Sequence, residues 1–133
     1  MNRKGFTLIE LIATIALLGI IAGISYVSIN KVIEQGIIND CNSLVKSIKM
    51  AASEYVSDNR YKRDFVRSVT DNKVIISGDT LTNNNYLSAP IINPFDKESI
   101  DPVDISIEVL LNGDYTVKQS SIIAPSMLKQ CKE

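Results

Sequence analysis

The sequence predicts an α+β chain in which one long N-terminal helix is followed by a small antiparallel sheet. The first observation is an apolar run over residues 6–29, whose only charged side chain is Glu10. The second is that apolar residues then recur every three or four positions, as they do on one face of a helix. The third is that short β-branched stretches follow in the second half, and two of them flank the turn-forming dipeptide Asn112-Gly113.

The composition excludes several classes of function. The 133 residues include 14 basic and 15 acidic side chains. The chain therefore lacks the excess of positive charge that is typical of a nucleic-acid binder. With 45% hydrophobic residues, the chain is also unlike a disordered protein. It has no His, which excludes histidine-based catalysis. Its two Cys are too few for a four-ligand Cys/His zinc site. We therefore expect one folded domain that is not an enzyme and needs no cofactor.

The apolar run has the length of a membrane span. Its 24 residues would form a helix about 36 Å long, enough to cross a hydrocarbon core of about 30 Å. Arg3 and Lys4 precede the run, and basic residues beside a first span tend to stay in the cytoplasm. Residues 30–133 carry 12 basic and 14 acidic side chains, a net charge of −2, as an ordinary soluble domain would. We expect that domain outside the cytoplasm.

Three common N-termini explain this run less well. A secretory signal has an apolar core of roughly 7–15 residues and a small-x-small cleavage site, neither of which is present here. A lipoprotein signal needs a Cys directly after its apolar run, but the first Cys is Cys41. A plain signal anchor fits the length, yet it leaves Glu10 unexplained. A charge inside a membrane helix costs at least about 2.5 kcal/mol and is by default a functional residue.

The heptapeptide Lys4-Gly5-Phe6-Thr7-Leu8-Ile9-Glu10 resembles the N-terminal signature of type IV pilins and of the pseudopilins of type II secretion and DNA-uptake machines. The resemblance implies that a membrane-embedded aspartyl prepilin peptidase cuts between Gly5 and Phe6, and that Phe6 is then N-methylated. It also implies a leader over residues 1–5, a membrane and polymerisation half over 6–29, and a pilin domain over 30–133 that includes the outer half of the helix.

The same resemblance gives a role to Glu10. Cleavage leaves a cationic amine at Phe6, and a carboxylate four residues on can neutralise that amine, either in its own chain or in a neighbouring subunit. Glu10 would then be an assembly contact, with a shallow interfacial position near Lys4 as the alternative. Gly19 and Gly23 form a G-x-x-x-G pattern through which neighbouring helices could pack, or they are ordinary membrane glycines.

The helix should continue beyond the span and pack on the sheet. Seven apolar residues at helical spacing share one face: Ile33, Ile37, Cys41, Leu44, Ile48, Ala52 and Tyr55. We expect the helix to end near Ser57-Asp58-Asn59. Strands are predicted over residues 73–77, closed by Gly78, and over 105–111 and 115–119. The last two should form a hairpin, because Asn112 and Gly113 can both take positive φ.

Cys41 and Cys131 are expected to form one disulfide, with two isolated thiols as the alternative. Thiols outside the cytoplasm tend to be oxidised, and closing so long a loop would stabilise the fold by about 4–5 kcal/mol in the chain-entropy model. The bond would hold the C-terminal tail on the helix, similar to the C-terminal disulfide of many pilins.

Two charged stretches are candidate binding sites. The basic one could touch DNA, although nearby Asp residues make a solvated loop the alternative; it comprises Arg60, Tyr61, Lys62, Arg63 and Arg67. The acidic one could bind calcium, as some pseudopilins do in the corresponding loop, or be a solvated turn; it comprises Asp96, Glu98, Asp101 and Asp104.

The sequence thus predicts a structural subunit that is cleaved after Gly5, stored in the cytoplasmic membrane and assembled into an extracellular pilus or a pseudopilus. Its expected partners are other pilin subunits, the prepilin peptidase, the assembly platform protein with its ATPase, and lipid. One alternative is a membrane-anchored binding module that never polymerises, and processing at Gly5 separates the two. The other is a DNA-uptake pilin, for which the basic stretch is the support.

Overall fold

The structure, a computed structural model, describes residues 5–131 except for the side chain of Val27. Arg3 and Lys4, on which the expected membrane orientation depends, lie outside the described residues. The chain divides into two compact units, Met1–Gly36 and Ile37–Glu133. The apolar run ends at Ile29, inside the first unit.

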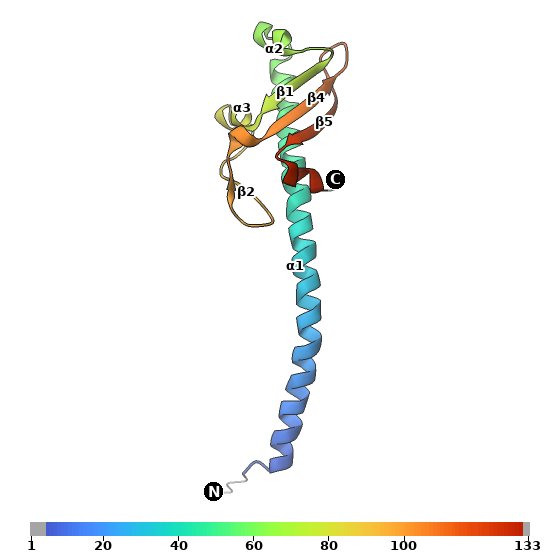
Figure 1. Cartoon of the computed structure of the whole chain (residues 1–133), viewed down its shortest axis with the longest axis vertical. Coiled ribbons are helices and arrows are strands. Elements are labelled where there is room, and N and C mark those ends of the chain that lie inside the picture. Colours follow the sequence, from blue (N-terminus) through green and yellow to red (C-terminus); the bar gives the residue numbers. More distant parts are fainter. Residues whose placement is uncertain (1–4, 132–133) are drawn as a thin grey trace. The chain divides into compact units, whose positions relative to one another are not determined.

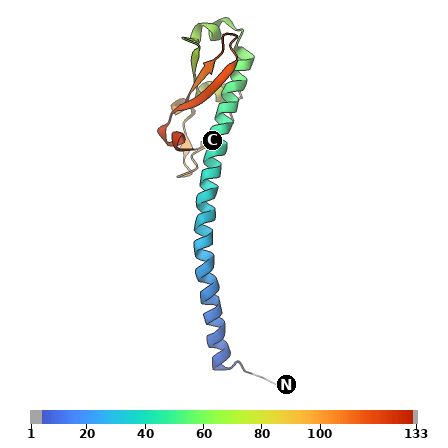
Figure 2. The ribbon, with the colours of Figure 1, turned by 90° about the vertical axis from the view of Figure 1, so that its right-hand side faces the viewer.

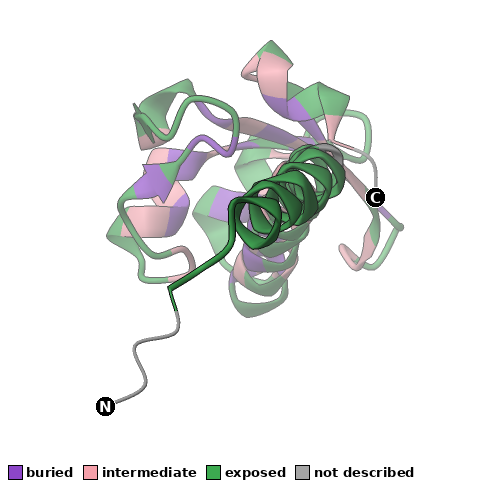
Figure 3. Cartoon of the chain, turned by 90° about the horizontal axis from the view of Figure 1, so that it is seen from below, coloured by how far each residue is buried: buried purple, intermediate pink, exposed green. Residues whose placement is uncertain are grey.

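The first unit consists of the start of helix α1 (Leu8–Asn59), coloured blue to cyan in Figure 1. The large apolar side chains of the first unit are exposed; Phe6, ahead of the helix, is 85% exposed and Ile29, within it, is 55% exposed. Figure 3 shows the described part of this unit as exposed. In the described part of the chain, α1 is the one helix long and apolar enough to cross a membrane. Its end at Asn59 agrees with the expected stop.

The second unit contains the rest of α1 and the sheet. The elements after α1 are α2 (Arg63–Ser68), β1 (Lys73–Ser77), α3 (Gly78–Asn83), β2 (Ile91–Ile92), β3 (Ser99–Ile100), β4 (Ser106–Leu111) and β5 (Val117–Ala124), with short 3-10 turns at Pro102–Asp104 and Ser126–Gln130. Strands β1, β4 and β5 form an antiparallel sheet in that order, and β2 pairs with β3. The expected helix-and-sheet fold is confirmed (Figures 1 and 2).

The core of the second unit lies between α1 and one face of the sheet. Strands bury alternate residues, because successive side chains point to opposite faces. Val74 and Ile76 of β1 pair with Val109 and Ile107 of β4, and all four are buried. The helix contributes five residues to the main buried cluster, and Cys41 of the helix is buried as well; the five are Val45, Ile48, Ala51, Ala52 and Val56.

The expected helix face is correct over its second half. Cys41, Ile48 and Ala52 are buried and Leu44 and Tyr55 are partly buried against the core. The expected face also included Ile33, nearer the start of the helix, but that side chain is 55% exposed, so the expectation is wrong at this position. Spacing alone shows which side chains share a face, but it does not show where along the helix the sheet begins to cover that face.

Gly78 does more than close the first strand. It opens α3, a short helix that the polar sequence after it does not suggest. Its backbone N–H donates to the Ile105 carbonyl at 2.8 Å. A Cβ on Gly78 would lie 2.6 Å from the Pro102 carbonyl oxygen and 2.8 Å from the Ile105 Cβ, so the two segments can approach only because glycine is present.

The hairpin between β4 and β5 is present, but its turn differs from the expected one. Neither Asn112 nor Gly113 has a positive φ, and Tyr115 takes the left-handed conformation instead, at φ 61°. The Asn112 N–H donates to the Thr116 carbonyl at 2.8 Å, so the loop is longer than a two-residue turn. Strand β5 also runs to Ala124, beyond the expected end at residue 119.

Candidate functional site

The candidate processing site lies directly ahead of α1. Gly5, Phe6 and Thr7 are exposed and belong to no helix or strand, and the helix begins at Leu8. A Cβ at Gly5 would meet nothing within 4 Å. The Gly5–Phe6 peptide bond is therefore accessible in a non-helical segment, which is the form in which a protease could reach it.

Thr7 and Glu10 close the first turn of α1 with a capping box. The Glu10 carboxylate oxygen Oε2 accepts hydrogen bonds from the Thr7 backbone N–H at 2.9 Å and from the Thr7 hydroxyl at 3.0 Å. In return the Glu10 backbone N–H donates to the Thr7 hydroxyl at 3.3 Å. These bonds satisfy N–H groups that have no partner within the helix. The sequence Thr-x-x-Glu signals such a box, but the part of Thr7 in it was not inferred from the sequence.

Gly19 and Gly23 lie on the exposed apolar part of α1. An added Cβ at either position would meet nothing within 4 Å in the described chain. Their role as a contact for a neighbouring helix therefore stays a prediction. Because glycine has no side chain, the backbone of a neighbouring helix could approach α1 closely at these two positions, as close helix packing in lipid requires.

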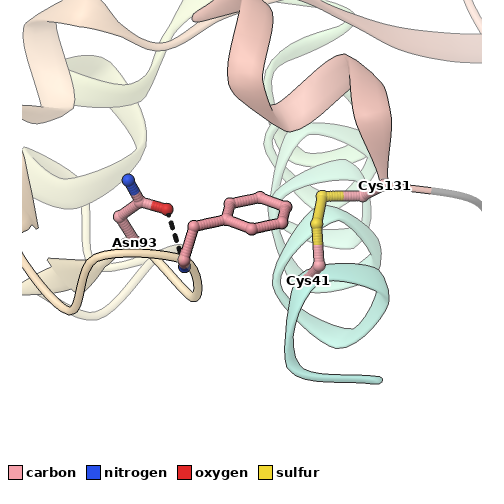
Figure 4. Close-up of a disulfide and its surroundings, with 4 residues drawn as sticks. Cys41, Asn93 and Cys131 are labelled. Atoms are coloured by element: carbon pink, nitrogen blue, oxygen red, sulfur yellow. Dashed lines mark hydrogen bonds between the residues drawn. A yellow bond between two sulfur atoms is a disulfide. The ribbon is translucent and has the colours of Figure 1, made fainter. Parts of the chain in front are cut away.

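The disulfide joins Cys41 of α1 to Cys131, whose Cα atoms lie 5.4 Å apart (Figure 4). The pairing that the resemblance implies is thus present. A cavity of about 240 Å³ lies beside it, lined by Ile38, Cys41, Asn42, Phe95, Gln130 and Cys131. The bond ties the end of the chain to the helix that the sheet packs on.

A loop near the disulfide is organised by Asn93, a buried polar residue that the sequence did not single out. Its side-chain oxygen accepts the Phe95 N–H at 3.1 Å, drawn as the dashed line in Figure 4, and its amide donates to Asp96 at 2.7 Å. The Lys97 ammonium lies 3.5 Å from the Asp40 carboxylate of α1. The loop is therefore tied to the helix by an ion pair as well as by packing.

Some of the acidic residues after Asn93 bond to the backbone of their own loop. Among the described residues, no group of three or more acidic or cysteine side chains lies close enough together to hold a metal ion. Asp96 accepts the Glu98 N–H at 2.9 Å, and Asp101 accepts the Val103 N–H at 3.0 Å to cap a 3-10 turn. Two of the four candidate calcium ligands thus hold the loop backbone.

The basic stretch lies at the end of α1 and on α2. Tyr61 is 78% exposed, and the Arg60 guanidinium lies 4.8 Å from its ring centroid.

Nearby, the Tyr86 hydroxyl donates to the Asp58 carboxylate at 2.8 Å. This hydrogen bond raises the pKa of Tyr86 above its ordinary value, because it favours the protonated phenol. The stretch joins an exposed aromatic ring to several cations, with carboxylates close by.

Comparison with known families gives one match. Residues 1–26 match the family described as the prokaryotic N-terminal methylation motif, which covers 26 of the 133 residues. No curated protein and no solved structure matches the chain. The match includes the accessible Gly5–Phe6 bond and the capping box of α1. Residues 1–26 thus match a prokaryotic N-terminal methylation motif, the type of signal found in type IV pilins, and the helix and sheet that follow fit a pilin-like fold.

Proposed function

We propose that the chain is a prepilin, a structural subunit of a type IV pilus or of a related pseudopilus. The observation that carries this proposal is the accessible Gly5–Phe6 bond, which lies within the methylation motif and directly ahead of a long apolar helix. The motif indicates prepilin-type processing and suggests a structural subunit rather than an enzyme. Processing removes the leader and leaves Phe6 as an N-methylated first residue.

The apolar half of α1 is the element through which subunits assemble. Its exposed side chains are covered by lipid before assembly and by the helices of other subunits afterwards. Glu10 is the one charge within this surface, and it meets the terminal amine of Phe6 in its own or a neighbouring chain. Gly19 and Gly23 allow the helices to approach closely. The prepilin peptidase, the platform protein and its ATPase complete the machine.

Cleavage tests the proposal directly. The full chain, expressed with a prepilin peptidase and extracted from membranes, should have the mass of a product that begins at N-methyl-Phe6. Gly5→Val should block cleavage, because the peptidase reads the small residue before the bond. Gly36→Ala is the matched control, since that glycine lies in α1 and an added Cβ would meet nothing within 4 Å. An intact N-terminus in cells with an active peptidase would refute the proposal.

Glu10→Ala tests the assembly contact. Cleavage and membrane insertion should continue, but filament yield should fall, because the substitution removes a charge partner and leaves the apolar surface in place. Glu34→Ala is the control, since Glu34 is an exposed carboxylate of the same helix beyond the apolar run. Unchanged filament yield would make Glu10 an interfacial residue only. A membrane-anchored binding module that does not polymerise would give an unprocessed chain and no filaments.

A DNA-uptake pilin is the second candidate, and the Arg60–Tyr61 pair favours it. An exposed aromatic ring with cations beside it can stack a base and contact phosphates. The full chain in detergent should then shift single-stranded DNA in a gel, and Tyr61→Ala should weaken the shift. The control is Phe95→Ala, an exposed aromatic residue of the loop between β2 and β3. Equal shifts from both variants would count against DNA binding at this surface.

A further inference from the structure

We propose that Asn112 is a site of spontaneous covalent modification, where the side-chain amide is lost as ammonia and a carboxylate takes its place. The site is the dipeptide Asn112-Gly113, in the loop between β4 and β5. Neither residue takes the positive φ that a two-residue turn would need, so the dipeptide does not serve the loop as a tight turn. The inference goes beyond the proposed function, since it depends on neither cleavage nor assembly.

The two reacting groups are accessible in the loop. Both residues are exposed, and a Cβ on Gly113 would meet nothing within 4 Å. Because glycine lacks that Cβ, nothing on residue 113 stands between its backbone nitrogen and the side chain before it. The loop N–H groups that donate hydrogen bonds within the described chain include those of Asn112, Tyr115 and Thr116. That of Gly113 donates none there, so its nitrogen has no such bond to lose before it reacts.

The reaction uses only these two residues and water. The Gly113 nitrogen attacks the side-chain carbon Cγ of Asn112, and the new N–Cγ bond closes a succinimide ring. The Cγ–Nδ2 bond breaks, and the amide leaves as ammonia with the proton that the Gly113 nitrogen gives up. Water then adds to one of the two ring carbonyls and opens the ring. The product is Asp, or isoaspartate when the backbone continues through the former side chain.

The hydrogen bonds of the loop show what the modification would change. The Asn112 side-chain amide donates to the Thr116 hydroxyl at 3.0 Å, and that hydroxyl donates to the Asp114 carboxylate at 2.6 Å. A hydroxyl carries one proton, so these bonds run in one direction, from the amide through the hydroxyl to the carboxylate. A carboxylate at position 112 has no proton to donate, and it adds a second negative charge near Asp114. The product therefore loses a hydrogen bond and gains a like-charge contact.

Ageing of the full chain tests the inference. The chain is purified in detergent and incubated at mildly alkaline pH, and samples are digested with trypsin and analysed by mass spectrometry. Residues 98–118 form one tryptic peptide, in which Asn112 is the one asparagine. Over days this peptide should gain the mass by which a carboxyl group exceeds an amide, in two products of different retention. Isoelectric focusing should show each converted chain shifted by one negative charge.

The chain provides its own control. Residues 74–97 form another tryptic peptide, which contains the exposed run Asn83–Asn85 but no asparagine followed by glycine. Its mass should stay at that of the unaged sample. Gly113→Ala is the matched variant, because Gly113 has no positive φ and an added Cβ would meet nothing within 4 Å. It should lower the rate at Asn112 several-fold, while circular dichroism shows an unchanged fold.

A parallel incubation in guanidinium chloride separates the effect of the loop from that of the dipeptide. The native chain should react measurably but more slowly than the unfolded one, because the Thr116 hydroxyl holds the Asn112 amide. Modification in the unfolded chain alone, or in neither, would show that the native loop protects Asn112 and would overturn the inference. So would equal gains in the two peptides, or an unchanged rate in Gly113→Ala. None of these outcomes bears on the proposed function, because neither processing nor filament formation is measured.

Discussion

The two units of the chain obtain their stability in different ways, although α1 belongs to both. In the first unit the large apolar residues are exposed, and the hydrogen bonds that order its start come from one turn of the helix, between Thr7 and Glu10. In the second unit the same helix turns a face to the sheet, and Ile48 and Ala52 are fully buried. One helix thus combines a surface that must find a partner with a surface that already has one.

This difference explains why the first unit needs other molecules. Burial of apolar surface contributes about 25 cal/mol per Å², and the apolar half of α1 obtains none of it within the chain. A continuous exposed apolar surface of this kind is stable in lipid or against copies of itself, but in water it promotes association. The second unit has a core, a sheet and a disulfide, and we expect it to fold without those partners.

The largest expected effect is the loss of assembly when the first region is removed. A fragment of residues 30–133 should be a folded monomer in solution, because it keeps the whole second unit. It should form no filaments, because it lacks the exposed apolar part of α1, which is the proposed assembly surface. Light scattering gives the mass and circular dichroism gives the folded state. Stable filaments from this fragment would place the assembly determinant in the second unit and refute the proposed mechanism.

The disulfide should contribute the next largest effect, confined to the second unit. Cys41 and Cys131 are 90 residues apart. The chain-entropy model then gives about 4–5 kcal/mol in the free energy of unfolding. Reduction of the fragment should lower its urea midpoint accordingly. The double variant Cys41→Ala/Cys131→Ser is the control, since reductant should not move its midpoint. A wild-type midpoint that is the same with and without reductant would contradict a structural role.

One pair of isoleucines isolates the difference between the two regions. Ile107 of β4 is 0% exposed, whereas Ile15 of α1 is 59% exposed. Ile107→Ala should destabilise the second unit by about 2–5 kcal/mol, through lost transfer energy and a cavity. Ile15→Ala should leave the unfolding of the second unit unchanged and lower filament yield instead. Chemical unfolding of full-length chain in detergent measures the first effect, and sedimented filaments measure the second. Equal effects of both variants on unfolding would mean that the two regions are not independent.

The elements that sequence predicted well are those in which one physical signal dominates. The helix end at Asn59 and strand β1 follow from turn-forming residues and from a β-branched run. Helix α2 was missed because Phe65 is its only buried residue amid charges, and α3 because Gly78-Asp79-Thr80 is typical of a turn. Strands β2 and β3 have two residues each, too few for any periodicity to be visible.

The candidate site divides in the same way. Gly5, Phe6 and Glu10 could be named from the motif, since the letters themselves carry the signal. Thr7 belongs to the same motif, but the hydrogen bonds that it makes with Glu10 are seen only in the geometry. The structural role of Asn93 depends on a loop whose fold no local pattern predicts, because its partners are backbone groups and Asp96.

The smallest expected effect concerns a turn of the second unit and its response to pH. The Thr116 hydroxyl donates to Asp114 at 2.6 Å and the Thr116 N–H at 3.2 Å, and these bonds lower the pKa of Asp114 below its ordinary value.

Because the folded pKa of Asp114 is lower than the unfolded one, the stabilisation is fully present above the unfolded pKa of about 3.9. It is lost as the pH falls through the folded pKa. Asp114→Asn should therefore slightly lower the stability of the 30–133 fragment at pH 7, and the difference from the wild type should disappear as the pH falls below about 4. Asp79→Asn is the matched control, because the hydrogen bonds of Asp79 to Ser77 and Thr82 use its backbone N–H and its backbone carbonyl. The first unit has no part in this turn, so full-length chain in detergent should show the same small change. A variant whose stability depends on pH in the same way as that of the wild type would show that Asp114 is not held by Thr116 in solution.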